Sequence, residues 1–303
     1  MRHGRGPGAE LVPDEVAAVV LPFLAGRGCR WHSAHMDFAT AFRRETLAFE
    51  AAARRAADAG TSPPVPSCPD WSMADLVLHL GGVHRFVIRI VEGGLTEPPD
   101  ITDVTVFGLP EDRTNWPTPE GGPHTGAVPP GLVDWFAEGA RALEAHLRNG
   151  DPEQRVWSWS RERTAGFWWR MQTIEAALHR WDAESALGAP GPVEAALAAD
   201  AITQTFEVMA PARRVWKEAP PGAGERFRLR QTDGPGVWTV SFEGEEVRLA
   251  RLDGDTGPCD LELTSTASDL MLFLWQRMPA DRLDGVRGDR AMADRYFTLV
   301  PPV

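Results

Sequence analysis

Hydrophobic residues recur at helical spacing in four separate stretches of the first two thirds of the chain. The stretches cover residues 37–58, 72–92, 131–149 and 164–187, and in each one apolar side chains three or four positions apart form a stripe. This period of about 3.6 residues is typical of amphipathic helices that bury one face. The pattern therefore predicts four helices packed around a common core.

The ends of these helices carry recognisable signals. Ser72 and Asp75 have the spacing of a capping box, which predicts a helix start at Ser72, and the pair Gly93-Gly94 stops that helix. Gly188 is followed two residues later by Pro190, which predicts the end of the fourth helix. A fifth helical stretch, at about 193–212, is expected to lead into a second domain.

The pattern changes from helical to strand-like at about residue 225. Short runs rich in β-branched and aromatic residues alternate with turn residues, as expected for successive strands. A helix at 267–278, capped by Thr266, and a final helix at 290–300 accompany them. The expected strands lie at 226–232, 236–244, 245–254, 259–266 and 282–289.

The fold class indicated by this order is α+β, with a four-helix bundle followed by a small α+β domain. We expect an N-terminal extension at 1–35 and the bundle at 36–190. A connecting helix and linker would follow at 191–224, and the small α+β domain at 225–303.

The segment 94–130 is rich in Pro, Gly, Asp and Thr and lies between two of the predicted helices. A connection of this length within a compact domain is usually either a functional flap or a loosely ordered surface loop. The sequence leaves both interpretations open.

The composition limits which binding partners and which cellular compartment we expect. The formal net charge of the 303 residues is −12, which argues against non-specific binding to nucleic acid or to an anionic membrane. The longest apolar run, at 16–26, is too short to span a bilayer. Cys29, Cys68 and Cys259 lie far apart and form no disulfide framework, so we expect a cytoplasmic protein.

Three polar residues share the stripe of the fourth predicted helix that should face the core. Glu175, His179 and Asp182 are three or four positions apart and therefore lie on one face. An ionised carboxylate that is buried without a partner costs several kcal/mol, roughly, so Glu175 needs compensation. Either a local Glu–His pair with hydrogen bonds in the core, or a metal ion bound by both side chains, would provide it.

The second predicted helix contributes one more imidazole. His79 lies on an otherwise aliphatic stripe, and together with Glu175 and His179 it makes a set of two histidines and one carboxylate. Three protein ligands with one open position are typical of catalytic zinc, and another divalent first-row metal could use the same ligands. Asp182 could orient an imidazole, or it could be a helix-surface acid paired with Arg180.

The remaining histidines are weaker candidates. His84 follows His79 by five residues, so we expect it at the edge of the second helix rather than on its core stripe. His35, His124 and His146 stand in polar contexts that are typical of surface histidines.

Two segments resemble a known family. SCPDWSMADLVLHLGGVH at 67–84 and RTAGFWWRMQTIEAALHRWDAESALG at 163–188 are similar to the two signature segments of the mycothiol-dependent maleylpyruvate isomerase family. The resemblance implies a DinB-like metalloenzyme bundle with a C-terminal sterol-carrier-protein-like domain. It also implies His79, Glu175 and His179 as metal ligands.

The resemblance further implies a substrate-binding arginine at the end of a helix in the C-terminal domain. Arg277 is the nearest match, although the glycine that usually precedes this arginine is replaced by Gln276. The reaction implied is metal-dependent, most simply with Zn²⁺. In it the low-molecular-weight thiol mycothiol adds to an unsaturated acid of the maleylpyruvate type and the cis double bond becomes trans.

Other functions remain open from the sequence. A mycothiol S-transferase acting on another electrophile, or a specialised biosynthetic metalloenzyme, could use the same site. A metal hydrolase is disfavoured, because the peptidase pattern H-E-x-x-H is absent and His79 is flanked by Leu78 and Leu80. A non-catalytic metal- or ligand-binding protein on the same scaffold is the third possibility.

Overall fold

The computed structural model describes residues 36–100, 103–118, 122–250 and 257–302, which form two compact units. Unit 1 lies within Phe42–Ala189. Unit 2 consists of Pro190–Val303 together with the short segment that precedes Phe42. Each unit has its own hydrophobic core, and the N-terminal residues 1–35 lie outside the described part of the chain.

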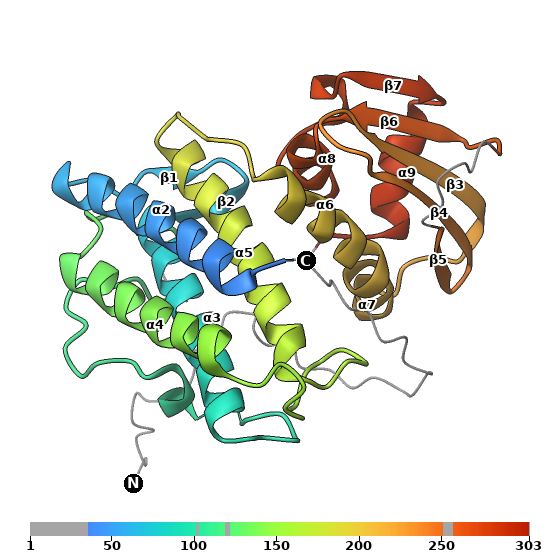
Figure 1. The fold of residues 1–303 in the computed structure, drawn as a ribbon. Helices are drawn as coiled ribbons and strands as arrows, with labels where there is room; N and C mark the ends of the chain where they lie inside the picture. Colours follow the sequence, from blue (N-terminus) through green and yellow to red (C-terminus); the bar gives the residue numbers. More distant parts are fainter. Residues whose placement is uncertain (1–35, 101–102, 119–121, 251–256, 303) are drawn as a thin grey trace, which may run out of the picture. The chain divides into compact units, whose positions relative to one another are not determined.

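Unit 1 is a bundle of four helices, as the hydrophobic pattern predicts (Figure 1). A two-stranded antiparallel ribbon stands between the first two helices in the chain, and a short 3₁₀ helix follows the second. The bounds are α2 (Phe38–Asp58), β1 (Pro64–Val65), β2 (Cys68–Ser72), α3 (Met73–Glu92), η1 (Val104–Phe107), α4 (Pro130–Asn149) and α5 (Ala165–Ala186).

The helix starts follow the capping signals in the sequence. Ser72 and Asp75 form the predicted capping box at the start of α3, with the Ser72 backbone N–H donating to the Asp75 carboxylate over 2.8 Å. At the start of α5, the Thr164 hydroxyl accepts from the Phe167 backbone N–H over 3.3 Å. Both contacts satisfy backbone donors that the first helical turn leaves unpaired, so they set where each helix begins.

The core of unit 1 is built from the apolar stripes of the helices. Phe49 of α2, Leu76 and Leu80 of α3, and Leu132 and Phe136 of α4 are fully buried in one cluster. Helix α3 packs against both α4 and α5, and it is therefore the helix through which residues of different elements meet.

Unit 2 contains a five-stranded sheet with helices against one of its faces (Figure 1). The strand order is β5-β4-β3-β6-β7, in which β3 and β6 are parallel and the other neighbours antiparallel. The strands are β3 (Gly222–Gln231), β4 (Val237–Gly244), β5 (Glu246–Ala250), β6 (Leu261–Ser265) and β7 (Gly285–Gly288). The helices are α6 (Ala195–Gln204), α7 (Ala210–Trp216), α8 (Ala267–Leu274) and α9 (Ala291–Leu299), with η4 at Ala280–Arg282.

One aromatic side chain joins the sheet of unit 2 to its helices. Tyr296 of α9 contacts Phe227 of β3, Phe242 of β4 and Phe273 of α8 at ring-centroid distances of 5.6, 6.3 and 6.1 Å. Because these rings come from two strands and two helices, α8 and α9 cover the same face of the sheet. The predicted α+β fold class is confirmed.

The fifth predicted helix differs in detail from the expectation. Instead of one helix at 193–212, α6 is followed by a π-helical turn, η3 (Thr205–Met209), and then by α7. Pro211 lies in the first turn of α7 and has no N–H to donate, and its ring excludes the regular α-helical contact with the carbonyl four residues earlier. A π turn is one of the ways in which a helix accommodates such a break.

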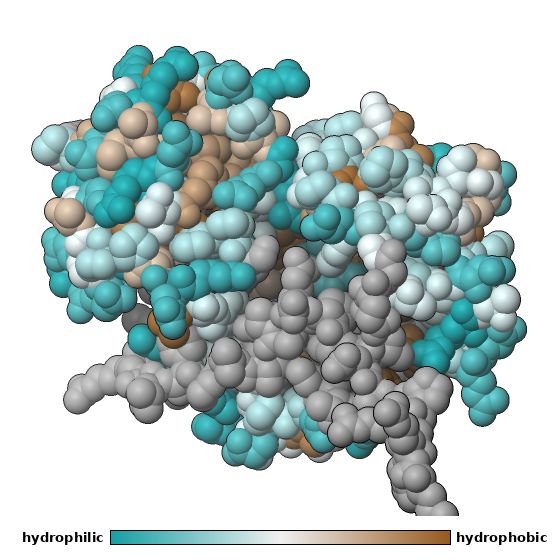
Figure 2. Space-filling view, turned by 180° about the vertical axis from the view of Figure 1, so that it is seen from behind, coloured by the Kyte–Doolittle hydropathy of each residue, from teal (hydrophilic) through white to brown (hydrophobic). Residues whose placement is uncertain are grey.

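The surface in Figure 2 is mostly hydrophilic, and hydrophobic residues on this face are scattered. This agrees with the net charge of −12 for the whole chain. Among the described helices, none combines the length and apolar character needed to cross a membrane.

Candidate metal centre

Two helices of unit 1 bring three candidate ligands together. His79 comes from α3, and Glu175 and His179 come from α5 one turn apart. One donor atom from each residue can be chosen so that all three lie within 4.8 Å of one another. The three residues singled out in the sequence therefore converge at one point between the helices.

The donor atoms of the three residues lie close to one another. Glu175 Oε1 lies 3.4 Å from His79 Nε2 and 4.0 Å from His179 Nε2. Ligand atoms at tetrahedral angles around zinc, with bonds of about 2.1 Å, are about 3.4 Å apart, so the set would contract around such an ion. The three side chains are 9% to 17% exposed, so the site is largely buried.

The charge state of Glu175 suits a ligand. Burial alone would raise its pKa, but the hydrogen bond with His79 and the nearby charges of His79, His179 and His84 outweigh that effect. The pKa of Glu175 therefore lies below its ordinary value and the carboxylate is ionised at neutral pH. Its other oxygen, Oε2, accepts a hydrogen bond from Gln172 Nε2 at 3.0 Å, which fixes the carboxylate plane.

A fully buried carboxylate holds the ring of His179. Asp182 Oδ2 lies 3.0 Å from His179 Nδ1, and Asp182 Oδ1 accepts a hydrogen bond of 2.5 Å from the Ser67 hydroxyl. A proton on Nδ1 leaves the Nε2 lone pair free and directed toward Glu175. This carboxylate–imidazole arrangement is the one that commonly supports histidine ligands of metals.

His79 is held mainly by aromatic packing. Its ring lies 4.7 Å from the Trp71 ring and 5.1 Å from the His179 ring, measured between centroids. Its Nδ1 atom is buried and has no hydrogen-bond partner among the described residues. Two imidazoles and an ionised carboxylate directed at one spot are a ligand set that fits a divalent cation such as zinc.

A cavity of about 460 Å³ lies beside His79. Trp71, Leu78 and Gly82 of the β2–α3 region form one wall. Phe107, Leu109 and Trp116 belong to the connection between α3 and α4 and form another wall, with Trp135 of α4. The described part of the 94–130 segment thus contributes to the wall of the cavity next to His79.

The Trp135 side chain, which forms part of the cavity wall, is fixed by contacts with other residues. Its Nε1 donates to the Gly108 carbonyl at 2.9 Å, and the Arg85 guanidinium carbon stands 4.2 Å above its ring. A Cβ atom on Gly81 would collide with the same ring, so α3 can approach α4 here only because residue 81 is glycine. Gly81 therefore allows close packing against Trp135, whereas the neighbouring Gly82 lines the cavity.

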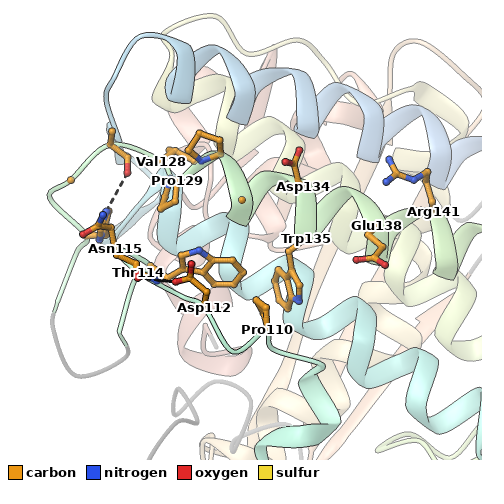
Figure 3. Close-up of a pocket in the computed structure, with 16 residues that line it drawn as sticks. Pro110, Asp112, Thr114, Asn115, Val128, Pro129, Asp134, Trp135, Glu138 and Arg141 are labelled. Atoms are coloured by element: carbon orange, nitrogen blue, oxygen red, sulfur yellow. Dashed lines mark hydrogen bonds between the residues drawn. The ribbon is translucent and has the colours of Figure 1, made fainter.

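A second, wider cavity of about 1030 Å³ lies between the loop that contains Pro110, Asp112 and Thr114 and the first turns of α4 (Figure 3). Trp116 and Trp135 line both cavities and so form a shared wall. Asp134 and Glu138 of the second cavity are ion-paired with Arg54 and Arg85 at 2.9 and 3.6 Å. None of the three candidate metal ligands lines this cavity, which places it outside the candidate site.

The expectation for His84 was wrong. Its side chain is fully buried rather than at the helix edge, and it packs against Phe42 and Phe136 with ring centroids 5.1 and 5.5 Å away. Desolvation lowers the pKa of His84 to about 3, so the ring is neutral. Both ring nitrogens lack a partner among the described residues.

His124 and His146 are not among the residues that converge at the candidate site, and Arg277 belongs to unit 2. His146 pairs with Glu92 at 3.0 Å on the surface, His124 is half-buried in the loop, and His35 falls outside the described residues. Arg277 follows α8 in unit 2, where its Nη1 donates to the Trp275 carbonyl at 2.8 Å. A role for Arg277 in substrate binding therefore stays a prediction from the sequence.

Comparison with known proteins covers most of the chain. The family model described as the mycothiol maleylpyruvate isomerase N-terminal domain matches residues 42–184. The model described as the MDMPI C-terminal domain matches residues 196–295. A search among curated proteins gave no match.

Two solved structures share the fold. They are described as the mycothiol-dependent maleylpyruvate isomerase and its H52A mutant. Each is 14% identical in sequence to this chain, with a TM-score of 0.50, and the match covers 82% of this chain and 90% of the other. At this identity the likeness extends to the fold alone.

Proposed function

The chain belongs to the mycothiol-dependent maleylpyruvate isomerase family, and from this premise we propose that it is a divalent-metal enzyme that uses a low-molecular-weight thiol such as mycothiol. The reaction proposed is the cis–trans isomerisation of an unsaturated acid of the maleylpyruvate type. Its setting would be the cytoplasm, where such thiols are kept reduced.

The convergence of His79, Glu175 and His179 is the observation that carries this proposal. Three donor atoms from two helices point at one spot, and a buried carboxylate orients one of the imidazoles. A metal held there would act as a Lewis acid and would lower the pKa of a thiol bound to it.

The reaction balances without an oxidant or a reductant. The thiolate sulfur bonds to the alkene carbon that is β to a carbonyl, and the π electron pair moves to the carbonyl oxygen as an enolate. The former double bond is now single and rotates. The enolate pair then restores the double bond in the trans geometry and expels the thiolate.

The residues of the chain would bind, orient and exclude water in this reaction. Asp182 keeps the Nδ1 proton of His179 in place, and Gln172 fixes the Glu175 carboxylate through Oε2. Trp71 and Trp116 enclose the space beside His79 and limit the access of water to it. Arg277 would bind a substrate carboxylate bidentately, as the family resemblance implies.

The test is a turnover assay with and without mycothiol. Purified protein loaded with Zn²⁺ is supplied with maleylpyruvate and other cis-unsaturated acids, and formation of the trans product is followed by absorbance. We expect turnover that requires both the metal and the thiol. Turnover that is equally fast without thiol, or bound metal without any turnover across the substrate panel, would contradict the proposal and favour a hydrolase or a binding protein.

A further inference from the structure

The cavity beside His79 is unusual in its lining for a site that receives a small dicarboxylate. Four of its walls are large hydrophobic or aromatic side chains, namely Trp71, Phe107, Trp116 and Trp135. Leu109 and Val83 add aliphatic surface between them. An apolar space of about 460 Å³ with few polar groups is typical of sites that bind apolar ligands of drug-like size.

The charged residues that line the cavity provide no buried cationic group that could bind a second carboxylate of a substrate. Arg113 is the single arginine or lysine among the described lining residues, and the Arg113 side chain is exposed to solvent. Asp70, also exposed, and Asp75 are acidic and would repel an anion. Apart from the proposed metal position next to His79, the described lining therefore offers a dianion no buried cationic partner for its second carboxylate, and burying that charge unpaired is costly.

The carboxylate of Asp75 already accepts hydrogen bonds from the protein. Asp75 Oδ2 accepts from the Ser72 backbone N–H, the Ser72 hydroxyl and the His124 backbone N–H at 2.8, 2.7 and 2.8 Å. These bonds serve the start of α3 and tie the loop to it, so Asp75 has a structural role. The surface available to a ligand beside His79 is thus mainly apolar.

Resting on the proposed thiol-dependent cis–trans isomerisation, we propose that the cavity beside His79 binds a ring-sized apolar group of the electrophile. The substrate would share with maleylpyruvate the double bond conjugated to a carbonyl, but it would carry an aromatic substituent in place of one of the two carboxylates. His79 belongs both to the candidate ligands and to the cavity wall, so a group bound there would place its double bond next to the site.

Gly82 determines how much room this group has. It lies on α3 one residue after the glycine that packs against Trp135, and it faces the cavity. A Cβ atom at position 82 would find only Phe107 Cδ1 within 4 Å, at 3.8 Å. A larger side chain at this position would therefore extend into the cavity without a clash at its base.

The test measures binding without thiol, so that no turnover is needed. Calorimetric titration of the purified protein with trans-4-phenyl-3-buten-2-one and with maleate compares an aromatic ketone with a small dianion. The proposal predicts at least tenfold tighter binding of the aromatic ketone. It also predicts at least a tenfold loss of that affinity in Gly82→Leu, and a smaller loss in Gly82→Ala, which adds a single carbon.

The matched control is Gly131→Leu, because Gly131 lies in α4, lines the second cavity and has open space around its Cβ position. This variant should bind the aromatic ketone as the unchanged protein does. Tighter binding of maleate than of the ketone, no binding of the ketone, or unchanged ketone binding in both Gly82 variants would overturn the proposal. Ketone binding that follows these expectations, together with a failed thiol-dependent assay, would refute the proposed function alone.

Discussion

Asp182 lies with Oδ2 3.0 Å from Nδ1 of His179, and its other oxygen is bonded to the hydroxyl of Ser67. The carboxylate comes from the same helix as the imidazole, one turn further on, and it is completely buried. Its position determines which nitrogen of His179 faces Glu175. The stability of the candidate metal centre therefore depends on a residue that does not contact the metal position itself.

Replacing Asp182 by Asn tests this dependence. The amide cannot stabilise a positively polarised imidazole, so metal affinity should fall by about tenfold to a hundredfold. Competition with a chromophoric chelator measures the affinity. Asp134→Asn changes an exposed acid of α4 and should leave metal binding unaltered. Equal affinities in Asp182→Asn and the unchanged protein would remove Asp182 from the centre.

The two adjacent glycines of α3 should respond oppositely to alanine. Gly82→Ala adds a methyl group at an ordinary contact distance from Phe107 and removes a helix-destabilising residue, so the free energy of unfolding should rise by up to about 1 kcal/mol. Gly81→Ala places the methyl group against the Trp135 ring and should lower the free energy of unfolding by about 1 to 3 kcal/mol. Urea unfolding of both variants measures the difference, and a similar change in the two would contradict the packing described here.

His84 should make the protein sensitive to acid. Its pKa is about 3 in the folded state and about 6.5 when unfolded, so below pH 6.5 the unfolded chain takes up a proton that the folded chain does not. Stability is therefore lost as the pH falls through the unfolded value. Between pH 7.5 and pH 5 the loss from this residue should be about 2 kcal/mol.

The comparison for His84 is with His84→Leu, both proteins being freed of metal by a chelator. Between pH 7.5 and pH 5, the free energy of unfolding of the leucine variant should fall by about 2 kcal/mol less than that of the unchanged protein. Parallel pH profiles for the two proteins would show that His84 is not buried as a neutral ring.

Arg277 is predicted to contact substrate rather than metal. Arg277→Ala should raise the KM for an acidic substrate by about tenfold to a hundredfold, the range of a lost charge-assisted hydrogen bond, and should leave metal content unchanged. Arg282→Ala, an exposed arginine of the same unit, is the control. An unchanged KM in Arg277→Ala would exclude Arg277 from substrate binding.

The fold could be predicted from the sequence where local signals are strong. The stripes of apolar residues and the Ser72–Asp75 capping box specify α3 almost to the residue, because helix periodicity and capping act over short distances. The break near Pro211 was not predicted, since whether a helix ends or passes through a π turn at proline depends on tertiary packing.

The candidate site, like the fold, could be predicted only where the signals are local in the sequence. Helical spacing placed Glu175, His179 and Asp182 on one face, and His79 on the core stripe of its own helix. Helical spacing failed for His84, because a side chain off the main stripe is buried when a third element such as Phe42 of α2 covers it. Ser67 and the cavity walls from the 94–130 segment carry no local signal, since their roles arise from contacts distant in sequence.

Metal content is the most direct test of the central claim, that His79, Glu175 and His179 together hold one divalent cation. Elemental analysis of purified protein after dialysis should find about one metal ion per chain in the unchanged protein. The surface variant His146→Ala should retain it, and His79→Ala and His179→Ala should have almost none. Full metal content in both His79→Ala and His179→Ala would contradict the account.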